Sequence, residues 1–334
     1  MRQSTAQRNK PGALLLIGII LFSGLYACTA PFASPDPVLP IARSEAIPPD
    51  AVKQSPETDP TPPILHHPDW LEPVPMPGLI NTPGSEDSPF ITPDGTQFFF
   101  FFTPDSSIPA EQQLNDGSTG IYYSSRSSPD SAWGEPVFLL LADSGESALN
   151  GCPTLHEQTL WFCSARSGNY RPIDFYTTDF LNGAAANREN AGDILNQQIG
   201  IGELHLSADG QAIYFHAELP GGVGGYDIWV TRQSAGVWQA PENVSAVNSP
   251  EMDGWPFLSL DGSELWFSRT FEGSPAIFRS LWNGESWGEP ELIVSQFAGE
   301  PALDAAGNLF FVHHFIENGV ILEADIYIAK RKTP

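Results

Sequence analysis

The segment Leu204–Ala217 reads LHLSADGQAIYFHA, and residues 226–232 read YDIWVTR. Asp209 and Gly210 lie between two apolar runs. Such a pair is typical of a tight hairpin turn, because glycine tolerates the positive φ that these turns require. The aromatic run at 226–232 predicts a third strand beside this hairpin.

The same unit recurs along the chain, and a fourth strand is added to it. Further hairpins begin at Pro89 (PFITPDGTQFFFF), Pro153 (PTLHEQTLWFCS), Pro256 (PFLSLDGSELWFSR) and Pro301 (PALDAAGNLFFVHH). Third strands follow at 120–126, 173–179, 276–282 and 325–331. A Trp with a Pro three residues later opens the fourth strand at Trp133, Trp238 and Trp287. A repeat of about 50 residues built from short strands predicts a β-propeller.

Five copies predict an all-β propeller of five blades, each with four antiparallel strands. We expect the blades at about 86–141, 149–199, 201–246, 252–295 and 298–332. The last copy ends without a fourth strand, whereas Asp69-Trp70-Leu71-Glu72-Pro73 has the pattern of one. Residues 69–79 are therefore expected to complete the last blade, which closes the ring and removes an unpaired strand edge. The alternative is that Trp70 belongs only to the Pro-rich segment before it.

Two of these motifs resemble a known family of repeats. Ser207-Ala-Asp-Gly210 and Gly224-Gly-Tyr-Asp-Ile-Trp229 resemble the WD40-like "PD40" propeller repeats of the TolB type. The resemblance covers about residues 69–332 and implies a propeller fold. Because TolB-like rings often have six blades, six blades are the alternative to five.

The first 27 residues have the pattern of a secretory signal peptide. Arg2, Arg8 and Lys10 precede the apolar run Ala13–Ala27, which is shorter than the ~20 residues that a membrane-spanning helix needs. The sequence Leu25-Tyr26-Ala27-Cys28 resembles a bacterial lipobox, and this implies removal of residues 1–27 and lipidation of Cys28. Thr29 favours sorting to the outer membrane, with the protein facing the periplasm or the cell surface. An ordinary signal peptide with an unrelated cysteine is the alternative.

Residues 28–68 are expected to form a disordered, Pro-rich tether that leads to the propeller at 69–332. They lack apolar periodicity, and 14 of the 50 residues from Thr29 to Gly78 are Pro. The whole chain has 40 Asp and Glu against 15 Lys and Arg, a net charge of −25. Since binding to phosphates requires a basic face, this charge argues against a nucleic-acid partner. We expect a monomer that reaches the membrane only through its lipid anchor.

Six side chains near the starts of the first strands are expected to meet at one mouth of the central channel, because first strands line the channel of a propeller. They are Glu86, Asp87, Asn150, Glu203, Asp253 and Glu300. Three interpretations stay open: a solvated acidic rim, a Ca²⁺ site, or a catalytic site that uses two of Asp87, Glu203, Asp253 and Glu300. The catalytic interpretation rests on glycosidases with acidic residues in the mouth of a five-bladed ring, and no cofactor is expected to be required.

Two cysteines remain if Cys28 is lipidated. If Leu155 lies opposite Leu160 across the short turn of the second copy, Cys152 lies opposite Cys163. We therefore expect a cross-strand disulfide between them in an oxidising compartment. Two buried thiols are the alternative.

The aromatic and histidine residues point to packing rather than to ligands. The run Phe98–Phe102 is expected to be a strand buried on both faces, and the four Trp residues of the fourth strands are expected to pack between blades. His313 and His314 are adjacent in a strand and so point to opposite faces, while His66 and His67 precede the ring. The sequence thus favours a lipid-anchored, non-enzymatic binding module of the bacterial cell envelope for a protein, peptide or glycan. The alternative is a carbohydrate-active hydrolase.

Overall fold

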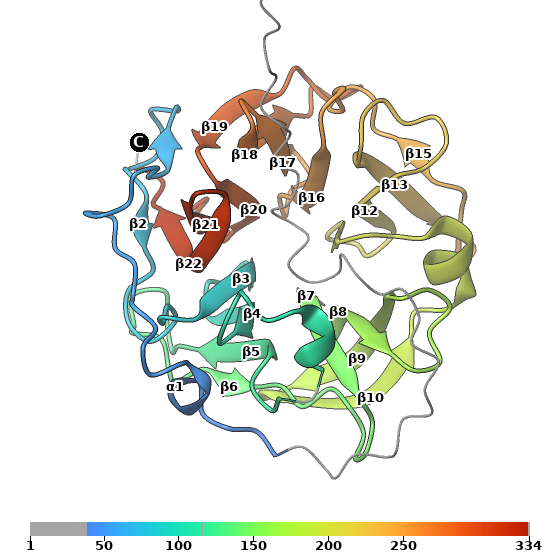
Figure 1. Cartoon of the computed structure of the whole chain (residues 1–334). Helices are drawn as coiled ribbons and strands as arrows, with labels where there is room; N and C mark the ends of the chain where they lie inside the picture. Colours follow the sequence, from blue (N-terminus) through green and yellow to red (C-terminus); the bar gives the residue numbers. More distant parts are fainter. Residues whose placement is uncertain (1–38, 115, 333–334) are drawn as a thin grey trace, which may run out of the picture.

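Five antiparallel β-sheets surround a central axis in the computed structural model, which describes residues 39–114 and 116–332 (Figure 1). This confirms an all-β propeller of five blades. The predicted signal peptide and Cys28 lie outside the described residues. Within those residues, no helix is long and apolar enough to cross a membrane.

Each blade follows the strand order that the repeats predict. The first blade contains β3 (Ser85–Ile91), β4 (Gln97–Thr103), β5 (Gly120–Ser125) and β6 (Val137–Phe138). The second contains β7 (Ala148–His156), β8 (Thr159–Arg166), β9 (Asp174–Leu181) and β10 (Ala184–Asn190). The third contains β11 (Leu204–Leu206), β12 (Ala212–Ala217), β13 (Asp227–Ser234), β14 (Val237–Trp238) and β15 (Glu242–Asn243).

The last two blades each include a strand from the N-terminal part of the chain. The fourth contains β16 (Asp253–Leu258), β17 (Glu264–Phe271), β18 (Ser274–Leu281), β19 (Glu291–Ser295) and β1 (Ile64–Leu65). The fifth contains β20 (Ala298–Leu303), β21 (Leu309–Glu317), β22 (Val320–Ala329) and β2 (Val74–Pro75). The helices are short: α1 (Arg43–Ala46), the 3₁₀-helix η1 (Ala110–Gln112) and the π-helix η2 (Ile194–Ile199).

The ring closes as expected, through the segment that contains Trp70. Strand β2 pairs with β22 in the register Val74 to Ile328, and Trp70 forms a bridge with Arg331. The Trp70 side chain is fully buried, and its Nε1 donates a hydrogen bond to the Gly307 carbonyl at 3.0 Å. The last blade thus obtains its outer strand from a segment more than 200 residues earlier.

The Ser/Thr-x-Asp-Gly motifs form the turns between first and second strands. In the third blade the Ser207 hydroxyl donates to Asp209 Oδ1, which also accepts the backbone N–H of Gln211. Gly210 has φ +68°, which glycine adopts without strain. These aspartates are therefore bound within their own turns.

First strands carry a bulge in four blades, where the pairing register shifts next to an X-Pro pair. The bulge residues have positive φ and are Ser88, Cys152, Trp255 and Glu300. A bulge bends its strand and redirects a side chain. Here the bulges place these four residues around the axis of the ring.

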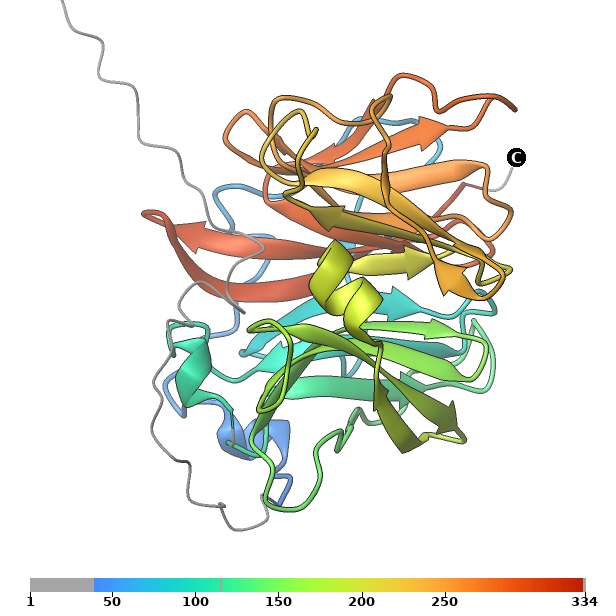
Figure 2. The same ribbon diagram turned by 90° about the vertical axis from the view of Figure 1, so that its right-hand side faces the viewer.

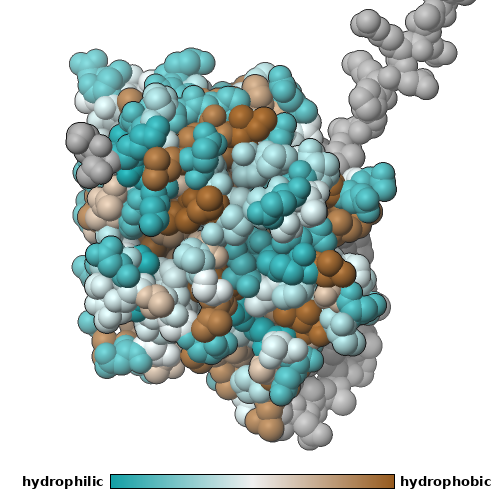
Figure 3. All heavy atoms as spheres, turned by 90° about the vertical axis from the view of Figure 1, so that its left-hand side faces the viewer, coloured by the Kyte–Doolittle hydropathy of each residue, from teal (hydrophilic) through white to brown (hydrophobic). Residues whose placement is uncertain are grey.

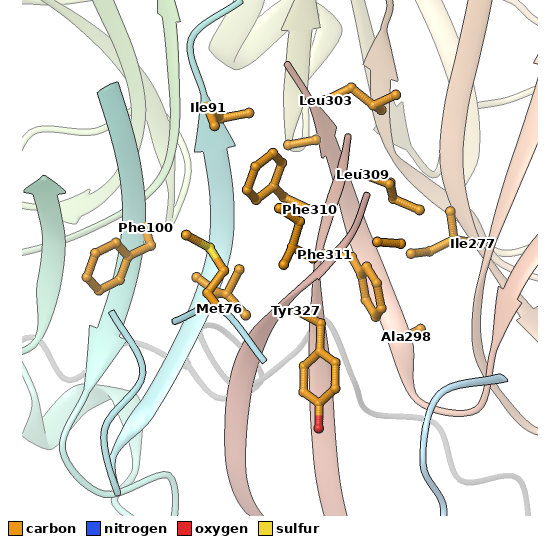
Figure 4. Close-up of a cluster of buried hydrophobic side chains, with 14 of the residues drawn as sticks. Met76, Ile91, Phe100, Ile277, Ala298, Leu303, Leu309, Phe310, Phe311 and Tyr327 are labelled. Atoms are coloured by element: carbon orange, nitrogen blue, oxygen red, sulfur yellow. The ribbon is translucent and has the colours of Figure 1, made fainter. Parts of the chain in front are cut away.

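Aromatic and aliphatic side chains from neighbouring blades form the core. The five side chains of Phe98–Phe102 are all buried, which confirms that this strand is covered on both faces. Figure 4 shows Phe100, Phe310 and Phe311 in a cluster to which the fifth blade and its neighbours contribute. Trp133 and Trp287 are also buried, whereas Trp238 is only partly buried.

Residues 39–68 differ from the expected tether, because they lie against the propeller; we call them the N-terminal strap. Arg43 Nη1 contacts Glu86 Oε1 at 3.1 Å, and Lys53 contacts both Glu323 and Asp325. Asp59 pairs with His313 at 2.7 Å, with both side chains fully buried. Isolated polar anchors of this kind have no periodicity, so the sequence pattern did not indicate them.

On the side seen in Figure 3, hydrophobic residues lie in separate patches among hydrophilic ones.

Cys152 and Cys163 form a disulfide with their Cα atoms 5.4 Å apart. The register differs from the expected one, since Gly151 rather than Cys152 lies opposite Cys163. Leu155 does lie opposite Leu160, but the bulge at Cys152 inserts one extra residue into β7 between Gly151 and Thr154 and so shifts the pairing of the preceding residues. The bridge therefore links the bulge to the second strand.

Candidate functional site

The two ends of the ring carry different parts of each blade. At one end, which we call the start face, the chain enters each first strand; the other end, the turn face, carries the turns between first and second strands. The long β21–β22 hairpin extends on the start-face side, at the left of Figure 2. The six predicted mouth residues all lie near the start face, but they do not form one group.

Glu86, Asn150 and Asp253 are bound within the scaffold. Arg166 Nη2 donates to Asn150 Oδ1 at 2.7 Å, and Arg269 Nε donates to Asp253 Oδ1 at 2.5 Å. Glu86 pairs with Arg43 of the strap and also accepts the backbone N–H of Thr82. Each of these three side chains is buried and has an arginine partner. They hold the loops that enter the first strands, so the expectation that they reach the channel mouth is wrong.

Asp87, Glu203 and Glu300 are the three that come together. Burial raises the pKa of Glu203 to about 8, and the charge of Asp87 adds to this effect. Burial also raises the pKa of Glu300 well above its usual value, with further contributions from Asp87 and Glu203. We call these three residues the carboxyl cluster. At neutral pH, close carboxyl groups of this kind share protons instead of all being ionised.

Three histidines near the cluster, His205, His216 and His314, are neutral at neutral pH. Burial lowers the pKa of His205 to about 3 and that of His216 to about 4. Burial also lowers the pKa of His314, whose Nε2 lies 4.0 Å from Asp87 Oδ2. The carboxyl cluster therefore receives no positive charge from these rings.

A small cavity of about 40 Å³, which we call the waist cavity, lies inside the bulges. Its walls include all four bulge residues together with Glu203, and Trp255 Nε1 donates to Glu203 Oε1 at 3.1 Å. The Cys152–Cys163 bridge fixes one of these walls. A volume of this size holds a few water molecules or one small polar group.

A larger cavity of about 600 Å³, which we call the turn-face funnel, opens between the turns. Its apolar walls include Phe90, Leu206, Phe257 and Leu303. Polar residues of the turns border it, among them Glu157, Asp261, Glu264, Asp304 and Arg331. The sequence pattern did not indicate this funnel, although three of its lining residues, Phe90, Thr154 and Phe257, directly follow X-Pro pairs.

His205 lies where the two cavities adjoin. Its ring centroid is 4.2 Å from that of Phe257 and 6.1 Å from that of Phe90, and its Nδ1 accepts the Leu258 N–H at 3.2 Å. Phe90, Thr154, His205 and Phe257 line both cavities. The funnel thus leads toward the waist cavity.

Metal ligation was one interpretation of the acidic residues. Across residues 39–114 and 116–332, no three or more His, Cys, Asp or Glu side chains are arranged to hold a metal ion. His313 binds Asp59 of the strap, and His66 Nε2 lies 2.8 Å from the Ser295 hydroxyl. These two histidines therefore have structural partners.

Comparison with solved structures gives similarities at low sequence identity. No known family and no curated protein matches the sequence. The chain is similar in structure to TolB from Acinetobacter baumannii, with 15% identity and a TM-score of 0.36 over 77% of this chain and 54% of that one. An endo-arabinase from Bacteroides thetaiotaomicron gives 18% identity and a TM-score of 0.46 over 74% of this chain and 94% of the enzyme. The chain thus spans about half the length of that TolB.

Proposed function

We propose that this protein is a lipid-anchored, non-enzymatic binding module of the bacterial cell envelope, and that a protein, peptide or glycan binds in the turn-face funnel. The volume of the funnel, about 600 Å³, supports this most directly. Ligand pockets are usually about 300–1,000 Å³, with apolar walls and a few polar groups. The funnel has both features.

The charge of the funnel border indicates what kind of segment binds there. Glu157, Asp261, Glu264 and Asp304 outnumber the cationic Arg331. Apolar walls below an acidic border favour a ligand with an apolar stem and a positive charge. A peptide segment meets this description better than a neutral glycan does.

Capture of the partner tests the proposal. Leu260 lines the funnel and is 58% exposed, whereas Val223, on a start-face loop, is 51% exposed. After crosslinking in intact cells, Leu260→Arg should lose the partner that the wild type retains, while Val223→Arg should keep it. Equal capture by both variants would place the ligand elsewhere.

The lipid anchor has its own test. Cys28→Ala should move the protein from the membrane fraction to the soluble fraction and remove the acyl mass from its amino terminus. Retention in the membrane with an unmodified terminus would reject this part of the proposal.

A hydrolase is the second candidate, because one observation favours it. A general acid must be protonated near neutral pH, and burial raises the pKa of Glu203 to about 8. Asp87 would then act as its carboxylate partner, since burial also raises the pKa of Glu300, while Asp253 is excluded by its contact with Arg269. Glu203→Gln should abolish glycan turnover, whereas the exposed Glu218→Gln should not. Absence of turnover in the wild type would leave only the binding function.

A further inference from the structure

The carboxyl cluster lacks the cationic partner that Glu86 and Asp253 have. Glu86 and Asp253 each contact an arginine. The fourteen residues that line the waist cavity, all within the described chain, include neither Lys nor Arg. The adjacent His205, His216 and His314 are neutral because burial lowers their pKa. The cavity therefore combines carboxyl groups with no positive charge.

Glu300 has an unused hydrogen-bonding atom at this cavity. The residue is 9% exposed, and its Oε2 has no hydrogen-bond partner. Neither ring nitrogen of the buried His314 makes a hydrogen bond, although its Nε2 lies 4.0 Å from Asp87 Oδ2. A buried carboxyl oxygen without a donor is costly, so a donor supplied by a ligand would stabilise this arrangement.

The size and the walls of the cavity indicate the type of donor. About 40 Å³ accommodates a group of the size of water but not a sugar ring. Trp255, Phe90 and Phe257 contribute aromatic walls, which favour a cation near their ring faces. A primary ammonium group is this small, carries three N–H donors and has the complementary charge.

We propose that the waist cavity binds a primary ammonium group between Glu203 and Glu300, at the end of an alkyl chain that enters through the turn-face funnel. This inference rests on the proposed binding function and specifies the ligand. The two cavities share Phe90, Thr154, His205 and Phe257, so the alkyl chain lies along apolar walls while its charged end reaches the carboxyl groups. A lysine side chain of a bound peptide has this form.

The pH dependence of binding follows from the groups around the cavity. The titratable groups near it are Asp87, His156, Glu203, His205, His216, Glu300 and His314. An ammonium ion binds the ionised cluster, and burial raises the pKa of Glu203 to about 8. Affinity should therefore rise between about pH 6 and pH 8, with release of protons on binding.

Calorimetric titration of the full chain with n-hexylammonium chloride tests the inference. n-Hexanol is the neutral probe of equal length, and CaCl₂ is the metal probe. We expect saturable binding of hexylammonium that is about tenfold or more tighter than that of hexanol at pH 8. Glu203→Gln and Glu300→Gln should each weaken hexylammonium binding by about tenfold or more, whereas Glu218→Gln, at an exposed position that lines neither cavity, should change it less than about twofold.

Several results would overturn the inference. They are equal binding of hexanol and hexylammonium, binding of Ca²⁺ alone, and equal weakening by Glu218→Gln and Glu203→Gln. The comparison of the three probes uses the wild type, so it does not depend on whether a variant folds. If hexylammonium does not bind but Leu260→Arg still loses the captured partner, this inference fails and the proposed function stands.

Discussion

Replacement of Trp70 with alanine should open the ring at its closing blade. The side chain is 0% exposed, lies in an edge-to-face contact with Trp266 at 5.4 Å, and has the Arg331 guanidinium 4.3 Å from its ring. Truncation of a buried Trp to Ala costs about 3–5 kcal/mol of the free energy of unfolding. For a domain of this size, that corresponds to a decrease in Tm of about 6–20 °C.

The matched control is Trp282→Ala in the fourth blade. Trp282 is 43% exposed and contacts Trp287, so its loss should cost about 1 kcal/mol or less. Chemical denaturation monitored by fluorescence, together with calorimetry, gives both values. Equal destabilisation by the two substitutions would show that the segment around Trp70 does not close the ring.

Three further predictions concern the bridge, the cluster and the strap. The double variant Cys152→Ala/Cys163→Ala should have a free energy of unfolding about 3 kcal/mol lower, as expected for the short loop that the disulfide closes. An unchanged denaturation midpoint under oxidising conditions would contradict this. Because the pKa of Glu203 is raised to about 8, the folded state binds a proton that the unfolded state releases, so stability falls between about pH 4.5 and 8. Glu203→Gln should therefore be more stable than the wild type at pH 8, by a free energy of unfolding on the order of 1 kcal/mol, but not at pH 5. Glu218→Gln is the control. A stability difference that does not depend on pH would reject the raised pKa of Glu203. Lys53→Ala removes the cation between Glu323 and Asp325 and should lower the free energy of unfolding by about 1–3 kcal/mol. Hydrogen exchange in residues 39–68 should become faster. Substitution of the exposed Lys330 with alanine should leave that exchange unchanged.

The fold could be predicted because each blade repeats local signals. Asp209-Gly210 fixes a turn by itself, and Trp70 repeats the pattern that opens the fourth strand in other blades. The strap could not be predicted in this way, since Arg43, Lys53 and Asp59 are single residues whose partners lie far away in the sequence. Their contacts depend on the closed ring and have no periodicity.

Only part of the candidate site could be predicted, because the position of each site residue along its strand is local but the direction of its side chain is not. Residues near the starts of the first strands lie at one end of the ring, but the directions of their side chains depend on the bulges. Glu300 is a bulge residue and lines the channel, whereas Asp253 lies two residues before a bulge and contacts Arg269. The bulges also form the waist cavity. The X-Pro pairs at four of the first strands were the available signal.

The face that binds the ligand can be measured directly with a photo-crosslinking amino acid at Leu260 or at Val223, introduced into the full chain in living cells. These positions are similarly exposed and lie on opposite faces. The turn-face funnel predicts a discrete crosslinked product from position 260 and none from position 223. A product from position 223 alone, or the same product from both, would contradict binding in the funnel.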